Sequence, residues 1–116
     1  MHQLHTHEGI TVLDLYGELG LSEIEEINQL LLSLLKQSHH KMVLNFGQVE
    51  HVHYAGISRW IKTCEQLKQL MELKFAAMSP YTKCIFQFVW GRDLVESFET
   101  VSEAMLSFQA NDRTWH

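Results

Sequence analysis

Histidines are the residues of this chain whose spacing first suggests chemistry. His51 and His53 are separated by one residue, so in an extended segment both imidazoles point to the same side and could share a metal ion. The usual outcome for such an isolated pair is two solvent-exposed side chains. We therefore expect no metal site, and His51 and His53 are the candidates if there is one. Unchanged Zn²⁺ or Ni²⁺ affinity after their substitution would dispose of the metal hypothesis.

Cysteines could act as nucleophiles, but their positions argue against it. Cys64 and Cys84 both fall on the apolar stripes of predicted helices, and burial raises the pKa of a thiol. We interpret them as reduced core thiols. The sequence contains neither a Gly-rich phosphate loop nor a convincing Ser-His-Asp or Cys-His arrangement. It therefore predicts a non-enzymatic protein without a cofactor.

Length and composition limit the architecture and the partners. The chain has 116 residues, 46% of them apolar, which suits one compact domain, expected over residues 1–110 with a loosely ordered tail at 111–116. No apolar run approaches the roughly 20 residues that cross a bilayer, and the N-terminus does not resemble a signal peptide. The net charge is −5 without a Lys/Arg cluster. We therefore expect a cytoplasmic protein without membrane insertion or nucleic-acid binding.

The elements that would position these residues alternate along the chain. Periodicity predicts the order β-β-α-β-α-β-α-β-α, beginning with a hairpin that turns at residues 7–9. Strands alternating with helices imply a mixed, mostly parallel sheet with about four helices packed on it, in a single α/β domain. Short buried strands are expected at residues 41–46, 73–78 and 95–98.

Helix ends are predicted from capping residues. Ser22 and Glu25 form a capping box at the start of the first helix, and Ser79 precedes Pro80 as the cap of the third. Ser102 is the expected cap of the last helix. The second helix begins where the third strand turns through Gly56, and its unpaired amides make this junction a natural docking point.

Four segments together resemble the STAS domain of anti-sigma factor antagonists: Ile10–Leu19, Val43–Val49, His53–Ile57 and Val101–Met105. They correspond to the family patterns G-x-L-D, x-L-D-L/F, D-S-S/T-G-L/I and S-x-x-E-A-L. The resemblance covers residues 9–108 and rests on order, spacing and three matched positions, Gly17, Leu19 and Gly56. It implies the STAS fold and a bacterial regulatory module that works by partner switching in signalling and transcription regulation.

This sequence departs from the family pattern at its acidic and hydroxyl positions. Gly20, Asn45 and His53 stand where the family has Asp. Tyr54 and Ala55 occupy the two hydroxyl positions, one of which is phosphorylated in the family. Because Ala55 has no hydroxyl and the Tyr54 ring is too long to replace a serine, we predict no Ser/Thr phosphorylation at this motif. Ser58 is the nearby substitute.

The resemblance implies a protein partner, with an anti-sigma factor that is also a serine-kinase-like ATPase as the candidate. Residues 54–74 contain four basic and two acidic side chains, a net charge of +2, which favours an acidic partner surface. A homodimer is a further possibility. The predicted partner-binding surface consists of His53, Tyr54, Ala55, Gly56, Ile57, Ser58, Arg59 and Lys62.

An alternative function belongs to a different class. The domain could respond to a small ligand or metal ion, or serve as a STAS subunit of a transport or signalling complex. Binding to an ATPase-type anti-sigma factor would favour the first function, and ligand-dependent melting of the purified protein would favour the second.

Overall fold

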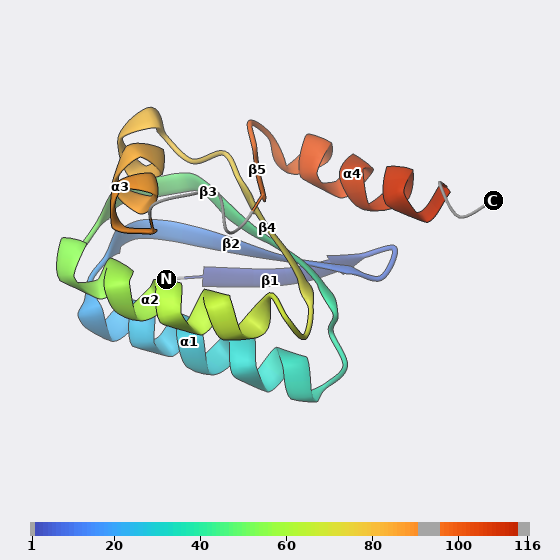
Figure 1. Ribbon diagram of the computed structural model, residues 1–116, viewed down its shortest axis with the longest axis horizontal. Coiled ribbons are helices and arrows are strands. Elements are labelled where there is room, and N and C mark those ends of the chain that lie inside the picture. Colours follow the sequence, from blue (N-terminus) through green and yellow to red (C-terminus); the bar gives the residue numbers. More distant parts are fainter. Residues whose placement is uncertain (1, 91–95, 114–116) are drawn as a thin grey trace.

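The computed structural model describes the backbone of residues 2–90 and 96–113, and the side chains of residues 2–89 and 96–108. Five strands and four helices follow one another in the predicted order (Figure 1): β1 (His2–His7), β2 (Ile10–Leu19), α1 (Leu21–Lys36), β3 (Lys41–Val52), α2 (Tyr54–Leu67), β4 (Glu72–Ala76), α3 (Pro80–Trp90), β5 (Glu96–Phe98) and α4 (Val101–Arg113).

The sheet has the simplest possible strand order, β1-β2-β3-β4-β5. β1 is antiparallel to β2, and β2, β3, β4 and β5 are parallel to one another. α1 and α2 lie along one side of the sheet, and α4 lies on the other (Figure 1). The predicted mixed, mostly parallel sheet with four helices is confirmed.

The main core fills the space between the sheet and the first three helices. Its centre is an aromatic cluster in which Phe46 of β3 contacts Trp60 of α2, Phe75 of β4 and Phe86 of α3, with ring centroids 5.1 to 6.0 Å apart. Trp60 is completely buried. Offset and edge-to-face ring contacts of this kind add to the stability gained by burying the rings. This cluster fixes α2, and therefore the start of α2, against the sheet.

A smaller core lies on the opposite face, beneath α4. It contains Ile10, Val12, Val43 and Ala76 from the sheet, with Ala104 and Phe108 from the helix. Lys74 of β4 is 3% exposed, and its Nζ donates a hydrogen bond to Ser107 Oγ and lies 4.2 Å from the centroid of the Phe108 ring. The cation of Lys74 thus contacts α4, and its aliphatic stem is buried with it.

The β1–β2 hairpin turns through Glu8 and Gly9, which have φ of 51° and 80°. Positive φ at both central positions is the geometry of a two-residue type I′ turn, which glycine accommodates easily. The predicted hairpin is therefore confirmed.

Several local predictions need correction. α1 begins at Leu21 with Gly20 as an N-cap that makes no side-chain hydrogen bond, so the Ser22–Glu25 capping box does not form. Ser22 instead donates to the Glu23 carboxylate at 2.6 Å, which lowers the pKa of Glu23. A residue inside the first turn cannot also be the cap, because the cap has non-helical backbone angles.

The cap of the last helix is also displaced. Thr100 Oγ1 accepts from the Glu103 amide at 3.1 Å, so Thr100 takes the role predicted for Ser102. At α3 the prediction is confirmed, because Ser79 Oγ accepts from the Thr82 amide at 3.1 Å.

Strand and tail boundaries differ from expectation as well. β3 continues six residues beyond Phe46, because residues 48, 49, 51 and 52 pair with the end of β2 after two register shifts. α4 extends to Arg113, so the first three residues of the expected tail are helical. Residues 91–95 and 114–116 lie outside the described residues; they include Gly91, the expected end of the third helix, and the start of the predicted last strand.

The two cysteines have different environments. Cys64 is completely buried in α2, and burial raises the pKa of its thiol. Cys84 in α3 is exposed, so the prediction that it is a core residue is wrong. α3 turns another side of its helix, marked by Phe86, toward the core.

Candidate functional site

The starts of α1 and α2 lie together at one end of the sheet, the end that also carries α3 (Figure 1). The last residues of β2 and β3, Leu19 and Val52, are paired in the sheet, and the amide of His53 donates to the Leu19 carbonyl at 2.9 Å. Gly56 lies against α1 so closely that a Cβ atom at position 56 would overlap Ile24 Cδ1. Glycine therefore lets the two helix starts meet without displacing the Ile24 side chain.

His53 caps α2. Its backbone is extended, with φ −66° and ψ 122°, and its Nδ1 accepts a hydrogen bond from the Ala55 amide at 3.3 Å. Side-chain acceptors at this position satisfy one of the amides that a helix start leaves unpaired. His53 thus supplies the acceptor where the sequence resemblance places an Asp, provided that Nδ1 carries no proton.

The predicted partner-binding residues divide into two sets by exposure. Gly56 and Ile57 are buried, so they position α2 and offer no side chain to a partner. The other six are exposed, and they occupy the cap, the first turns and the outer side of α2: His53, Tyr54, Ala55, Ser58, Arg59 and Lys62. Tyr54 is 57% exposed, which is high for a large aromatic side chain.

The fold adds α1 residues that the sequence alone did not place beside this surface. Arg59 Nη1 forms a 3.3 Å ion pair with Glu25 Oε2 of α1. Leu21, 52% exposed, lies next to Gly56. The net charge of +2 counted along residues 54–74 is therefore offset at the helix starts by an acidic neighbour. A surface of mixed charge, with exposed Leu21 and Tyr54, replaces the slightly basic one expected from the sequence.

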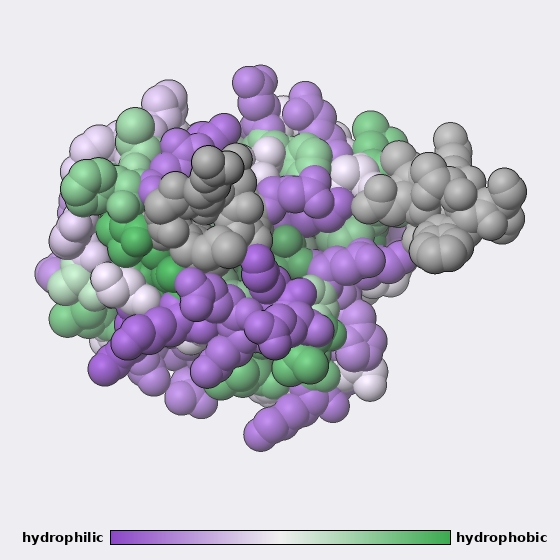
Figure 2. All heavy atoms as spheres, viewed as in Figure 1, coloured by the Kyte–Doolittle hydropathy of each residue, from purple (hydrophilic) through white to green (hydrophobic). Residues whose placement is uncertain are grey.

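Apolar residues continue from the helix starts onto α3. Tyr81 and Phe88 are 64% and 81% exposed. Figure 2 shows hydrophobic residues gathered at the α3 end of the molecule, whereas the outer side of α2 is mainly hydrophilic in the same view. Exposed apolar area of this kind is typical of surfaces that contact another protein.

His51 and His53 occupy different local structures. His51 lies in β3, paired with Glu18 of β2, whereas His53 has left the strand and caps α2. Across residues 2–90 and 96–113, the structure shows no group of three or more His, Cys, Asp or Glu side chains placed to hold a metal ion. In the same residues it shows no helix long and apolar enough to cross a membrane.

The comparison with protein families matches the STAS domain over residues 2–104. The chain belongs to the STAS domain family. A comparison with curated proteins finds no match.

Solved structures with the same fold include anti-sigma factor antagonists. One from Mycobacterium paratuberculosis has a TM-score of 0.79 at 18% identity, with 92% of each chain covered. The Bacillus cell fate determinant SpoIIAA in its phosphorylated form has a TM-score of 0.73 at 21% identity, covering 93% of this chain and 99% of that one. The STAS fold also occurs in the murine anion transporter Slc26a9, with a TM-score of 0.74 at 15% identity, covering 91% of this chain but 18% of that one.

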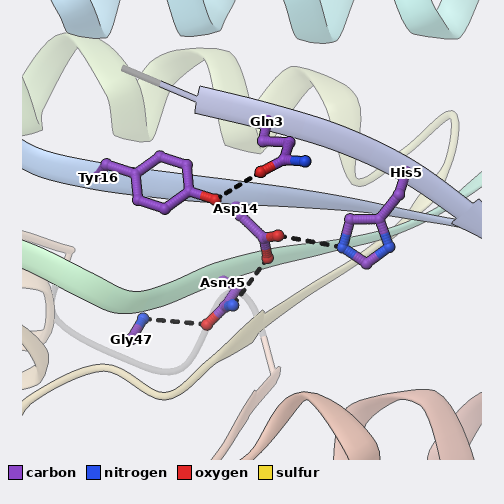
Figure 3. Close-up of polar contacts among 6 residues, drawn as sticks. All are labelled: Gln3, His5, Asp14, Tyr16, Asn45 and Gly47. Atoms are coloured by element: carbon purple, nitrogen blue, oxygen red, sulfur yellow. Dashed lines mark hydrogen bonds and ion pairs between the residues drawn. The ribbon is translucent and has the colours of Figure 1, made fainter.

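A polar cluster on the opposite face of this STAS domain was missed by sequence reasoning (Figure 3). Asp14 of β2 accepts from Asn45 Nδ2 at 2.8 Å and contacts His5 Nε2 at 3.1 Å. Asn45 Oδ1 accepts from the Gly47 amide at 3.0 Å. The sequence predicts that the strands containing Asp14 and Asn45 are neighbours. It does not predict their register, which places these two residues opposite each other. An Asp at position 45 would place a second carboxylate against Asp14, so the cluster explains how Asn45 is accommodated.

Proposed function

We propose that this STAS domain is a cytoplasmic regulatory module that binds a protein partner through the starts of α1 and α2, in the manner of an anti-sigma factor antagonist. The observation that carries the proposal is the exposed surface around Tyr54, held rigid by Gly56 and by the Trp60 cluster beneath it. Aromatic residues that are exposed on a rigid scaffold are the usual anchors of protein interfaces.

The family relationship and the resemblance at His53–Ile57 supply the partner class. An ATPase-type anti-sigma factor is the candidate partner, and its release of a sigma factor would make this protein a regulator of transcription. The mixed charges of Arg59, Glu25 and Lys62 at the rim would tune encounter and specificity more than affinity.

Control by serine phosphorylation is not expected at this surface. Ala55 is exposed but has no hydroxyl, and Tyr54 presents a ring. Phosphorylation would add about two negative charges at an interface, which is how it breaks complexes of this type. We propose that binding here is constitutive or controlled by another means. Stoichiometric phosphate on Ser58 or Tyr54 in the intact mass, after coexpression with candidate kinases, would contradict this.

The direct test is binding of the purified protein to a purified ATPase-type anti-sigma factor from the same organism, measured by calorimetry. The double variant Tyr54→Asp, Lys62→Glu should lower affinity at least about tenfold, because truncating an interface anchor costs more than 1 kcal/mol. Leu106→Asp is the matched control, since Leu106 is 60% exposed on α4, across the sheet from α2 (Figure 1). Binding that survives the double variant would contradict the proposed surface.

The ligand-responsive alternative predicts a different result. A small ligand or metal ion that binds the folded protein raises its melting temperature in a concentration-dependent way. A melting shift with Zn²⁺ that is lost in His51→Ala, together with no binding to the anti-sigma factor, would favour the alternative.

A further inference from the structure

β1 forms one edge of the sheet, and its outer side is open. It pairs only with β2 in the strand order, and the side chains of all six of its residues are exposed. Among the described residues, no backbone–backbone hydrogen bond from a loop or turn reaches its outer edge. The opposite edge strand, β5, has three residues (Glu96–Phe98). An exposed edge strand of six residues is long enough to pair with another strand.

This edge carries none of the usual protection against pairing. Natural edge strands are blunted by Lys, Pro, inward charges or bulges. Residues 2–7, His-Gln-Leu-His-Thr-His, contain no Lys, Arg, Asp, Glu or Pro. Their register with β2 is continuous from His2↔Leu15 to His7↔Ile10, without a bulge. The irregularities of this sheet lie instead between β2 and β3.

The hairpin turn determines which backbone groups face outward. A two-residue turn makes His7 and Ile10 a hydrogen-bonded pair, and hydrogen-bonded pairs alternate along an antiparallel ladder. Residues 3, 5 and 7 therefore bond to β2. The amides and carbonyls of His2, Leu4 and Thr6 point away from the sheet.

The outward backbone groups of these three residues are complementary to those of β1 in a second copy of the chain. A two-fold axis at Leu4 pairs Leu4 with its own copy and His2 with Thr6 of the other copy, so every outward amide and carbonyl of the three residues is used. Moving the axis to His5 leaves the outward groups of His2 without a strand partner. Leu4 is also the one apolar side chain of the strand and is 40% exposed, and the axis at Leu4 brings the two copies of it together.

We propose that this protein forms a homodimer by antiparallel pairing of β1 with β1 of a second copy, with the two-fold axis at Leu4. The two five-stranded sheets then become one ten-stranded sheet, and the interface is isologous. The starts of α1 and α2 belong to other elements, so the dimer does not depend on the proposed partner or on its surface.

The test is the mass of the full chain in solution by sedimentation equilibrium at pH 8, from about 1 to 1000 µM, because small interfaces bind weakly. The wild type should pass from monomer to dimer in this range. Leu4→Lys should remain monomeric, because it places two cations opposite each other at the axis. The control Leu70→Lys changes another exposed leucine, 62% exposed against 40% for Leu4, in the connection between α2 and β4, and should still dimerise. Far-UV circular dichroism checks that each variant is folded.

Disulfide trapping tests the register. Leu4→Cys in a Cys84→Ser background should oxidise to a covalent dimer, since opposed residues in a ladder have Cα atoms about 5.5 Å apart, within the range of a disulfide. Leu70→Cys in the same background should not. A monomeric wild type over the whole range would overturn the proposal. So would a Leu4→Lys dimer, or trapping at position 70 but not at position 4.

Discussion

The face of the sheet beneath α1, α2 and α3 is closed by apolar side chains, whereas the opposite face is covered by α4 over only part of its width. On the first face, Phe46, Trp60 and Phe86 pack in one continuous core. On the second, a small core includes Ala76, and beside it the sheet presents Asn45 and Asp14 in hydrogen bonds. The first face holds the start of α2 in place by close packing, and the second uses specific polar contacts. The two faces should therefore respond differently to substitution.

The largest expected effect is at the centre of the closed face. Trp60→Ala should lower the free energy of unfolding by about 3–5 kcal/mol, because it leaves a cavity in a packed aromatic cluster. Urea unfolding followed by circular dichroism, at a fixed protein concentration, measures the change. Trp60→Phe should cost clearly less, since it keeps a ring and removes the indole N–H, which has no hydrogen-bond partner among the described residues. Equal losses for the two variants would contradict the role assigned to ring packing.

The partly covered face depends on Lys74. Lys74→Ala should cost about 2 kcal/mol, because it removes a charged hydrogen bond to Ser107, the contact of the cation with the Phe108 ring and the packing of the stem. Lys74→Met keeps the stem and loses only the cation, so its cost in urea unfolding separates the two contributions. If Lys74→Met is as stable as the wild type, apolar packing alone holds α4 in place, and the two faces do not differ in this respect.

On the same face, the stability of the polar cluster around Asp14 and Asn45 should depend on its net charge. Asn45→Asp keeps the acceptor for the Gly47 amide but replaces the donor to Asp14 with a second carboxylate. We expect a loss of about 1 kcal/mol at pH 8. The loss should shrink as salt is added, because salt screens the repulsion between two partly exposed carboxylates. A loss that does not change with salt, measured by urea unfolding at low and at high salt, would show that like-charge repulsion is not the cause.

The smallest expected effect is at the outer margin of the cluster. The imidazole of His5 is 50% exposed, and its contact with Asp14 is open to solvent. His5→Ala should change the free energy of unfolding by less than about 0.5 kcal/mol at pH 8. A loss comparable with that of Asn45→Asp would mean that the hairpin strand β1 is part of the cooperative polar network.

The alternation of helices and strands was predictable because each long helix carries its apolar stripe in local sequence, as in Ile24, Ile27 and Leu31. Helix starts were harder. Ser22, Ser102 and Thr100 are all plausible caps, and the choice among them depends on where the preceding strand or turn releases the backbone. β3 beyond Phe46 was missed because Gln48 and His51 show no apolar pattern and are strand residues only through their pairing with β2.

The candidate site was predicted only in part. Tyr54, Arg59 and Lys62 were expected at a surface and are exposed. The contribution of α1 was not foreseeable, because Leu21 and Glu25 are more than 30 residues from the α2 residues that they adjoin. The exposure of Cys84 was likewise undetermined, since α3 has apolar residues on several sides and only the position of the sheet shows which side is buried.

The sequence by itself determined the order of the elements, the family resemblance and the missing hydroxyl at Ala55, because these depend on residue type and short-range spacing. Tertiary structure alone decided that Gly56 lies against Ile24, that Glu25 forms an ion pair with Arg59, that Asn45 donates a hydrogen bond to Asp14, and that β1 is an edge strand. Each of these joins segments distant in the chain, and such contacts are set by the register of strands and the packing of helices, which local sequence does not encode.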